Sequence, residues 1–137
     1  MFGTQARRSA LLPIISSVDV AGTSIQLSNS LKLLGVTFDG RFSFDDQITA
    51  VVKACNYHLA ALRHIRPVLS KDVATAIACS IVGTRLDYCN GLYYGMSASN
   101  FTKLQRVQDS LAKTVVAAPQ FVSASAARRS LHWLPIR

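Results

Sequence analysis

The hydrophobic pattern of this 137-residue chain changes its period close to Ser43. Before that point, apolar and polar residues alternate in Val18 to Val20 and in Thr23 to Leu27, on either side of Ala21-Gly22. After it, apolar residues recur every three or four positions. Alternation is typical of half-buried strands, and the longer period is typical of amphipathic helices. The sequence therefore predicts an α+β fold, mainly α, with a β element at residues 1–40 and a helical unit at residues 41–137.

Within the β element, the first two segments predict a pair of strands joined by a tight turn. A third strand is predicted from Leu31 to Phe38, in which Gly35 allows a bulge or a close backbone approach. Asp39-Gly40 should end that strand as a turn.

The second part predicts a bundle of three or four helices. A first helix should run from about Asp45 to Ile65 and stop before Pro67, and a second should begin after Ser70 as N-cap. A third is expected from Asn100 to Ala117 with Ser99 as its cap, followed by a short helix or turn at 123–130. The side chains predicted to be buried are Ile48, Val51, Val52, Cys55, Leu59 and Leu62 in the first helix, Val73, Ala74, Ile77, Ala78, Ile81 and Val82 in the second, and Phe101, Leu104, Val107, Leu111 and Val115 in the third.

The charge balance limits the class of partner. Fifteen Lys and Arg against seven acidic residues give a formal net charge of +8 and a pI near 9.9. Such a balance favours polyanions, either nucleic acid or an acidic membrane face, although a merely soluble basic domain has the same composition. The longest apolar stretch, Val73 to Gly83, is well short of the roughly 20 residues that cross a bilayer. No membrane partner is therefore expected.

Cys55, Cys79 and Cys89 are odd in number and far apart, so the sequence predicts neither a disulfide framework nor a zinc site. A reduced intracellular compartment, cytoplasmic or nuclear, fits this usage. No Gly-x-Ser-x-Gly elbow and no glycine-rich phosphate loop occurs in the sequence. These motifs therefore give no catalytic, metal or cofactor residues.

Four short signatures follow one another in the chain: Leu33 to Asp39, Arg85 to Asn90, Leu104 to Gln108 and Leu131 to Pro135. Their order and separation resemble the C-terminal third of the reverse transcriptases of non-LTR retrotransposons. These RNA-directed DNA polymerases belong to LINE-like elements of the jockey and chicken-repeat lineages. The resemblance covers nearly the whole chain.

The resemblance implies that the chain comprises the last palm strands and the thumb, the helical domain that holds the template-primer duplex by its backbone. Leu34, Gly35 and Val36 match the strand with which such enzymes grip the primer end, although an ordinary set of sheet residues is the equal alternative. The catalytic part, which uses Mg²⁺, would lie upstream of Met1. We therefore expect a truncated polymerase segment without a cofactor of its own.

One acidic pair deserves comparison with the catalytic motif of that family, an aromatic-x-Asp-Asp hairpin. In Phe44-Asp45-Asp46 no residue separates the aromatic side chain from the acids, and the pair begins a predicted helix. There the acids compensate the helix dipole. Two-metal nucleotide transfer needs paired carboxylates, so the chain alone is not expected to be an enzyme.

The remaining candidates are basic. Phosphate contact needs only positive charge at backbone spacing, which makes it independent of sequence and dependent on salt. The third helix places Lys103, Arg106 and Lys113 on one flank, and these should be the principal contacts. The nucleic-acid-binding set predicted for an RNA or DNA template-primer duplex is Lys53, Arg63, Arg66, Lys71, Lys103, Arg106 and Lys113. A solvated face that binds nothing specific remains the alternative.

One rival hypothesis is a helical protein-interaction module, in which apolar surface at Leu34, Val36 and Phe38, left uncovered by the missing palm, would dock a partner or a second copy of the chain. Another is a non-functional remnant of a decayed element.

Overall fold

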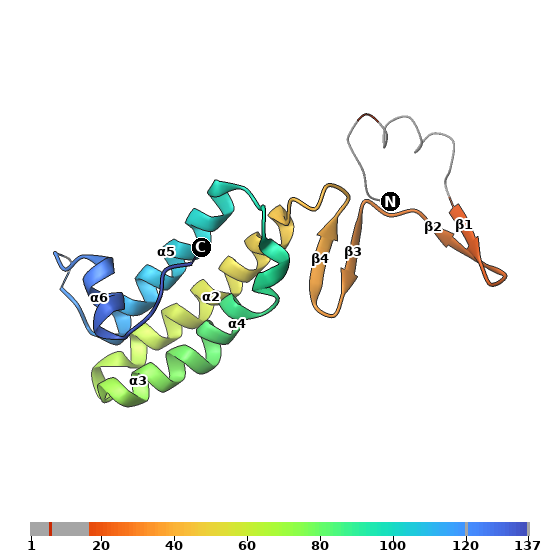
Figure 1. Cartoon of the computed structure of the whole chain (residues 1–137). Coiled ribbons are helices and arrows are strands. Elements are labelled where there is room, and N and C mark those ends of the chain that lie inside the picture. Colours follow the sequence, from red (N-terminus) through yellow and green to blue (C-terminus); the bar gives the residue numbers. More distant parts are fainter. Residues whose placement is uncertain (1–5, 7–16, 120, 137) are drawn as a thin grey trace. The chain divides into compact units, whose positions relative to one another are not determined.

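A computed structural model describes residue 6 and residues 17–119 and 121–136 (Figure 1). Two antiparallel strand pairs precede a mainly helical region, which confirms the predicted fold class. The chain divides into two compact units, Met1–Gln47 and Ile48–Arg137, so the division falls within the first turn of the first long helix. We call them the β unit and the helical unit.

The first strand pair has the predicted form. Strands β1 (Ser17–Val20) and β2 (Thr23–Gln26) are antiparallel, and Val18 lies opposite Ile25. Ala21 and Gly22 join them with φ angles of 49° and 79°. Positive φ at both central residues is characteristic of the tight turns whose twist matches that of the strands.

The predicted third strand, Leu31 to Phe38, is wrong, because the segment folds back on itself. Strands β3 (Ser30–Leu33) and β4 (Val36–Asp39) form a second antiparallel pair, with Leu33 opposite Val36. Leu34 and Gly35 are the turn between them, with φ angles of 48° and 82°. Gly35 therefore supplies a left-handed turn position instead of a bulge.

A carboxylate holds the loop after β4. Asp39 Oδ1 accepts hydrogen bonds from the backbone N–H groups of Arg41 (2.9 Å) and Ser43 (3.1 Å). Its Oδ2 accepts hydrogen bonds from the backbone N–H of Phe44 (2.7 Å) and from the Ser43 hydroxyl (3.1 Å). Phe42 and Phe44 both have positive φ in this loop. The rings of Phe38, Phe42 and Phe44 lie 5.8–6.3 Å apart, so the loop has an aromatic centre of its own.

The helical unit is built mainly from α2, α3 and α5. Helix α2 (Asp45–Ile65) and helix α5 (Ala98–Val115) run in the same direction, whereas α3 (Lys71–Ile77) begins near the C-terminal end of α2 and runs in the opposite direction (Figure 1). The shorter elements are η1 (Arg66–Val68), a π-helical turn η2 (Ala78–Gly83), α4 (Thr84–Asp87), η3 (Asn90–Tyr93) and α6 (Ala124–Ser130).

The predicted core stripes of α2 and α5 are largely confirmed. The buried members are Ile48, Cys55, Leu59 and Leu62 in α2, and Leu104, Val107, Leu111 and Val115 in α5. The stripe predicted for the second helix is too wide, because Val73 and Ile81 are exposed. Its buried side chains are Ala74, Ala78 and Val82, spaced by four, so this helix contributes a single narrow row.

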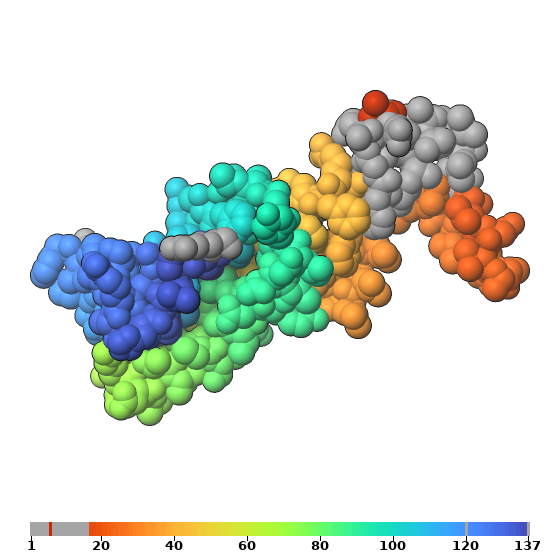
Figure 2. Space-filling model, in the orientation of Figure 1, coloured from red at the N-terminus to blue at the C-terminus, as the bar shows by residue number. Residues whose placement is uncertain are grey.

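The helix caps are partly as predicted. Ser70 caps α3, with its hydroxyl accepting the N–H of Val73. The cap of α5 is Ser97 and not Ser99, because the backbone of Ser97 is still extended and its hydroxyl accepts the N–H of Asn100. Ser123 caps α6, and the segment from α6 onwards lies on the outside of the helical unit, in blue in Figure 2.

Candidate nucleic-acid interface

The positive charge of the chain belongs to the helical unit. Residues 48–137 hold eleven Lys and Arg against three Asp, a balance of +8, whereas residues 1–47 hold four of each. Nucleic-acid affinity scales with the number of phosphates neutralised, so any backbone contact should come from this unit.

Two of the predicted residues tie helix α2 to the end of α5. Arg66 Nε donates to the carbonyl oxygens of Val115 (2.8 Å) and Thr114 (3.2 Å), and its Nη1 donates to that of Leu69 (2.8 Å). Arg63 Nε donates to the Thr114 hydroxyl at 3.3 Å. Arg66 therefore caps the last carbonyls of α5, of which that of Thr114 also accepts the N–H of Ala117 at 3.1 Å, and this is a structural task.

A hollow opens beside this junction. It encloses about 510 Å³ and is lined by Arg63, Arg66, Pro67, Ser110, Lys113, Thr114, Ala117 and Ala118. Three cationic side chains and two hydroxyl groups thus border one space. Such a lining suits an anionic group, since both Arg and Lys donate charge-assisted hydrogen bonds to phosphate oxygens.

The same junction fixes the relative height of α2 and α5. The helices run in the same direction (Figure 1), and Arg63 lies level with Thr114. Lys53 precedes Arg63 by ten residues, and Lys103 precedes Lys113 by ten. At 1.5 Å per residue, Lys53 and Lys103 therefore lie about 15 Å along the helices from Arg63 and Lys113.

We call Lys53, Arg63, Lys103, Arg106 and Lys113 the basic face. Lys53, Arg63 and Arg106 are exposed, and Lys103 and Lys113 are half-buried. Lys103 also has an internal role, because its Nζ donates to Oδ1 of Asn100 at 3.0 Å, and Asn100 is fully buried. Lys103 is thus less available to a phosphate than Arg106 or Lys113.

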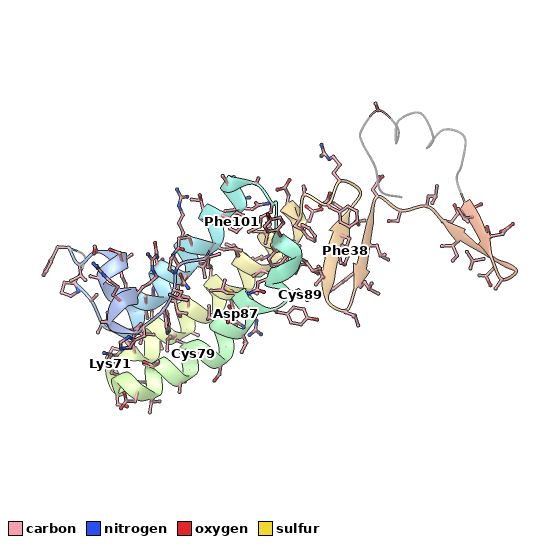
Figure 3. The ribbon with its side chains drawn as sticks, viewed as in Figure 1. Phe38, Lys71, Cys79, Asp87, Cys89 and Phe101 are labelled. Carbon is pink, nitrogen blue, oxygen red and sulfur yellow. The ribbon has the colours of Figure 1, made fainter. Side chains whose placement is uncertain are left out.

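Lys71 does not belong to the basic face. It is the first residue of α3 and is exposed at the end of the helical unit where that helix begins (Figure 3). The structure therefore brings five of the seven predicted cations onto two neighbouring helices, gives Arg66 a structural task at their end, and places Lys71 on a third helix.

Two of the three acidic residues of the helical unit lie on other helices, but Asp109 lies on α5, three residues after Arg106 and four before Lys113. Asp72 is in the first turn of α3, and Asp87 ends α4. Asp109 forms an ion pair with Arg128 of α6. A polyanion approaching α5 would therefore meet one carboxylate beside Arg106 and Lys113, and Arg128 already pairs with that carboxylate.

The primer-grip-like residues do not form one strand. Leu34 is 82% exposed at the turn, whereas Val36 is 1% exposed and opens β4. The expectation that Val36 presents uncovered apolar surface is wrong, and Phe38 is only half-buried. Leu34 and Gly35 are accessible at the tip of the hairpin, so a contact with a primer end stays a prediction for those two.

The acidic pair Asp45 and Asp46 occupies the first turn of α2, as predicted. The hydroxyl of Ser43 donates to Asp45 Oδ2 at 3.0 Å. Over the described ranges, no group of three or more His, Cys or Asp side chains is placed to hold a metal ion.

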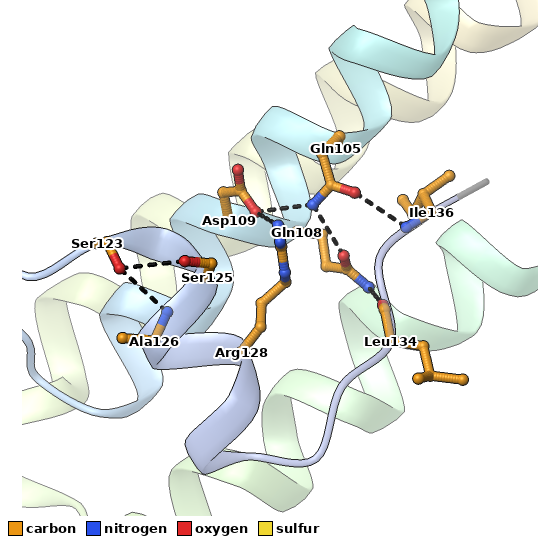
Figure 4. A network of polar contacts seen from close by, with 9 residues as sticks. All are labelled: Gln105, Gln108, Asp109, Ser123, Ser125, Ala126, Arg128, Leu134 and Ile136. Atoms are coloured by element: carbon orange, nitrogen blue, oxygen red, sulfur yellow. Dashed lines mark hydrogen bonds and ion pairs between the residues drawn. The ribbon is translucent and has the colours of Figure 1, made fainter.

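Sequence reasoning missed a polar network that joins the third and fourth signatures (Figure 4). Gln108 Nε2 donates to the carbonyl oxygen of Leu134 at 2.9 Å, and the N–H of Ile136 donates to Gln105 Oε1 at 2.9 Å. Gln105 Nε2 also donates to Asp109, the partner of Arg128. The recurrence of Gln at two positions three apart on one helix was the available signal.

No model of a known protein family matches this chain, and no curated protein or solved structure matches it. Among the helices of the described residues, none combines the length and the apolar character needed to cross a membrane.

Proposed function

We propose that this chain is the C-terminal part of a non-LTR retrotransposon reverse transcriptase, comprising the last palm strands and the thumb, and that its helical unit binds nucleic acid through the phosphate backbone. The partner is a template-primer duplex of RNA and DNA, held without regard to its sequence. The chain alone does not polymerise nucleotides.

One observation carries this proposal: Arg63, Arg66 and Lys113 line one hollow where α2 meets α5, and Lys53, Lys103 and Arg106 lie on the same two helices, in the unit that holds the entire net charge. The two levels of the face are separated by about 15 Å. Phosphates along one strand of a duplex follow each other every 3.4 Å or so along the axis, so one duplex can reach both levels. The four ordered signatures are the support for assigning the parent enzyme to this class.

A binding titration tests this function directly. The chain should bind duplexes of unrelated sequence with similar affinity, and log affinity should fall linearly with log salt. If each cation of the basic face neutralises one phosphate, the slope should approach about −4.5. A flat salt dependence, or a strong preference for one sequence, would contradict backbone binding.

The absence of polymerase activity has a separate test. The purified chain, given a primed RNA template and Mg²⁺ or Mn²⁺, should incorporate no nucleotide, because Asp45 and Asp46 begin a helix instead of forming a metal-binding hairpin. Incorporation that is abolished by Asp45→Ala with Asp46→Ala would overturn this part of the proposal.

A second candidate function is self-association or protein binding through the β unit. Its two hairpins expose Val18, Val20, Ile25, Leu31 and Leu33, each at 46–54% of its area, besides Leu34. Two-stranded hairpins are marginally stable in water without a covered face. Sedimentation velocity at rising concentration should show association, and Val18→Thr with Ile25→Thr should weaken it. A monomer throughout would exclude this candidate.

A further inference from the structure

We propose that Tyr57 is a base-stacking position, so that the surface next to the basic face takes an unpaired or single-stranded stretch of nucleic acid in addition to duplex backbone. This inference rests on the proposed function, because it concerns what the same polyanion does beyond its phosphates. It starts from an aromatic side chain that neither the core nor the network of Figure 4 uses.

Tyr57 is 73% exposed in the middle of helix α2. Lys53 lies one turn before it, and His64 lies two turns after it. Residues separated by four or seven share one side of a helix, so these three follow one line along α2. All three are exposed, as is Ala60 between them, whose small side chain leaves room above the ring.

The ring of Tyr57 is also oriented. Its centroid lies 5.3 Å from that of His58, and the two ring planes meet at 79°. This edge-on contact restricts the rotation of the Tyr57 side chain while most of its surface stays open. A rigid, accessible ring loses little side-chain entropy when a base stacks on it.

The surroundings select the occupant. The exposed positions that adjoin Tyr57 on α2 are Lys53, Ala60 and Ala61, and α2 carries no acidic side chain after Asp46, so a polyanion meets a cation and no carboxylate of this helix there. A nucleotide satisfies both features, since its base stacks on an aromatic face while its phosphate pairs with a nearby cation. Duplex bases are stacked on each other already, which is why the ligand must be unpaired.

The test uses the full chain and a single-stranded oligonucleotide that carries 2-aminopurine, whose fluorescence is quenched on stacking. Tyr57→Leu should lower affinity for the single strand about 5- to 150-fold, the equivalent of one stacked base. Tyr57→Phe should retain both the affinity and the quenching. Neither variant should change the slope of log affinity against log salt, since no phosphate contact is removed.

Tyr94 provides the matched control, because it is 95% exposed but lies in the segment after η3, outside α2 and α5. Tyr94→Leu should leave the affinity unchanged. The inference is overturned if Tyr57→Leu binds single strands like the wild type, if Tyr57→Phe loses as much as Tyr57→Leu, or if Tyr94→Leu loses equally. Duplex binding that persists in those cases leaves the proposed function standing, whereas failure of the wild type to bind any nucleic acid overturns both.

Discussion

At the scale of single residues, Asp39 shows how one side chain fixes a loop. Burial alone raises the pKa of its carboxyl group, but the hydrogen bonds from Ser43, Arg41 and Phe44 outweigh that effect and hold the pKa below its ordinary value. The ionised form is therefore the one that the folded loop prefers. Phe42 and Phe44 have positive φ angles, which cost backbone strain energy. The hydrogen bond from the Phe44 N–H to the Asp39 carboxylate helps to offset that cost.

Replacing Asp39 with Asn should destabilise the β unit by about 1–2 kcal/mol at neutral pH, because an amide offers one acceptor oxygen in place of two. A group whose pKa is lower in the folded state stabilises fully above its ordinary pKa and loses that contribution as pH falls through the folded pKa. Amide hydrogen exchange at residues 41–44 measures this opening. The difference in opening free energy between wild type and variant should become smaller below about pH 3.9. A difference that stays constant through that range would contradict the stabilising role of the ionised Asp39 carboxylate.

The three cysteines should differ in reactivity. Cys55 is fully buried, and burial raises the pKa of its thiol, opposed only in part by the charge of Arg85. Cys79 is exposed. Alkylation of the folded chain with N-ethylmaleimide, located by mass spectrometry, should therefore label Cys79 first and Cys55 only after unfolding. Early labelling of Cys55 would mean that the interior opens more readily than its packing indicates.

At the scale of elements, the two hairpins have the same type of turn, but the residues of the second turn suit that backbone conformation less well. Each has a non-glycine residue followed by Gly, both at positive φ, but Leu34 is a bulky residue in a conformation that Asn tolerates better. Leu34→Asn should stabilise the β3–β4 hairpin by about 0.5–1 kcal/mol, seen as slower amide exchange in β4. Faster exchange would show that the Leu34 side chain is held by contacts that outweigh its backbone strain.

The C-terminal segment depends on two glutamines of α5. Gln105→Leu with Gln108→Leu removes the hydrogen bonds to Ile136 and Leu134, at a cost of about 1–3 kcal/mol for the two. Trp133 lies in that segment, so its fluorescence should shift towards that of solvent-exposed indole while the helical circular dichroism stays the same. Unchanged fluorescence would mean that apolar contacts alone hold the segment.

These elements also show what a sequence can predict. The stripes of α2 and α5 were predictable, because long amphipathic helices repeat the same signal over several turns. The β3–β4 turn was not, because Leu-Gly inside an alternating run fits a bulge as well as a turn. The narrow row of α3 and the Gln105–Ile136 contact depend on which neighbour covers a face, and such tertiary information is absent from local patterns.

At the scale of the whole molecule, the charge separates along the chain. The helical unit carries all of the net positive charge, and the β unit carries none. The predicted cations lie on helical elements, but their spacing could not reveal that Arg66 caps α5 or that Lys103 supports the buried Asn100. Lys53, Arg106 and Lys113 are consequently the members of the basic face best suited to test phosphate binding without disturbing the fold.

The salt dependence of duplex binding by a triple variant tests the central claim most directly. Lys53→Gln, Arg106→Gln and Lys113→Gln together should reduce the magnitude of the slope of log affinity against log salt by about 2.7, equally for every duplex sequence. The matched control, Lys32→Gln, Arg41→Gln and Arg129→Gln, removes the same charge outside α2 and α5 and should leave the slope as in the wild type. Equal slopes for the two triple variants would contradict the claim that the basic face binds phosphate.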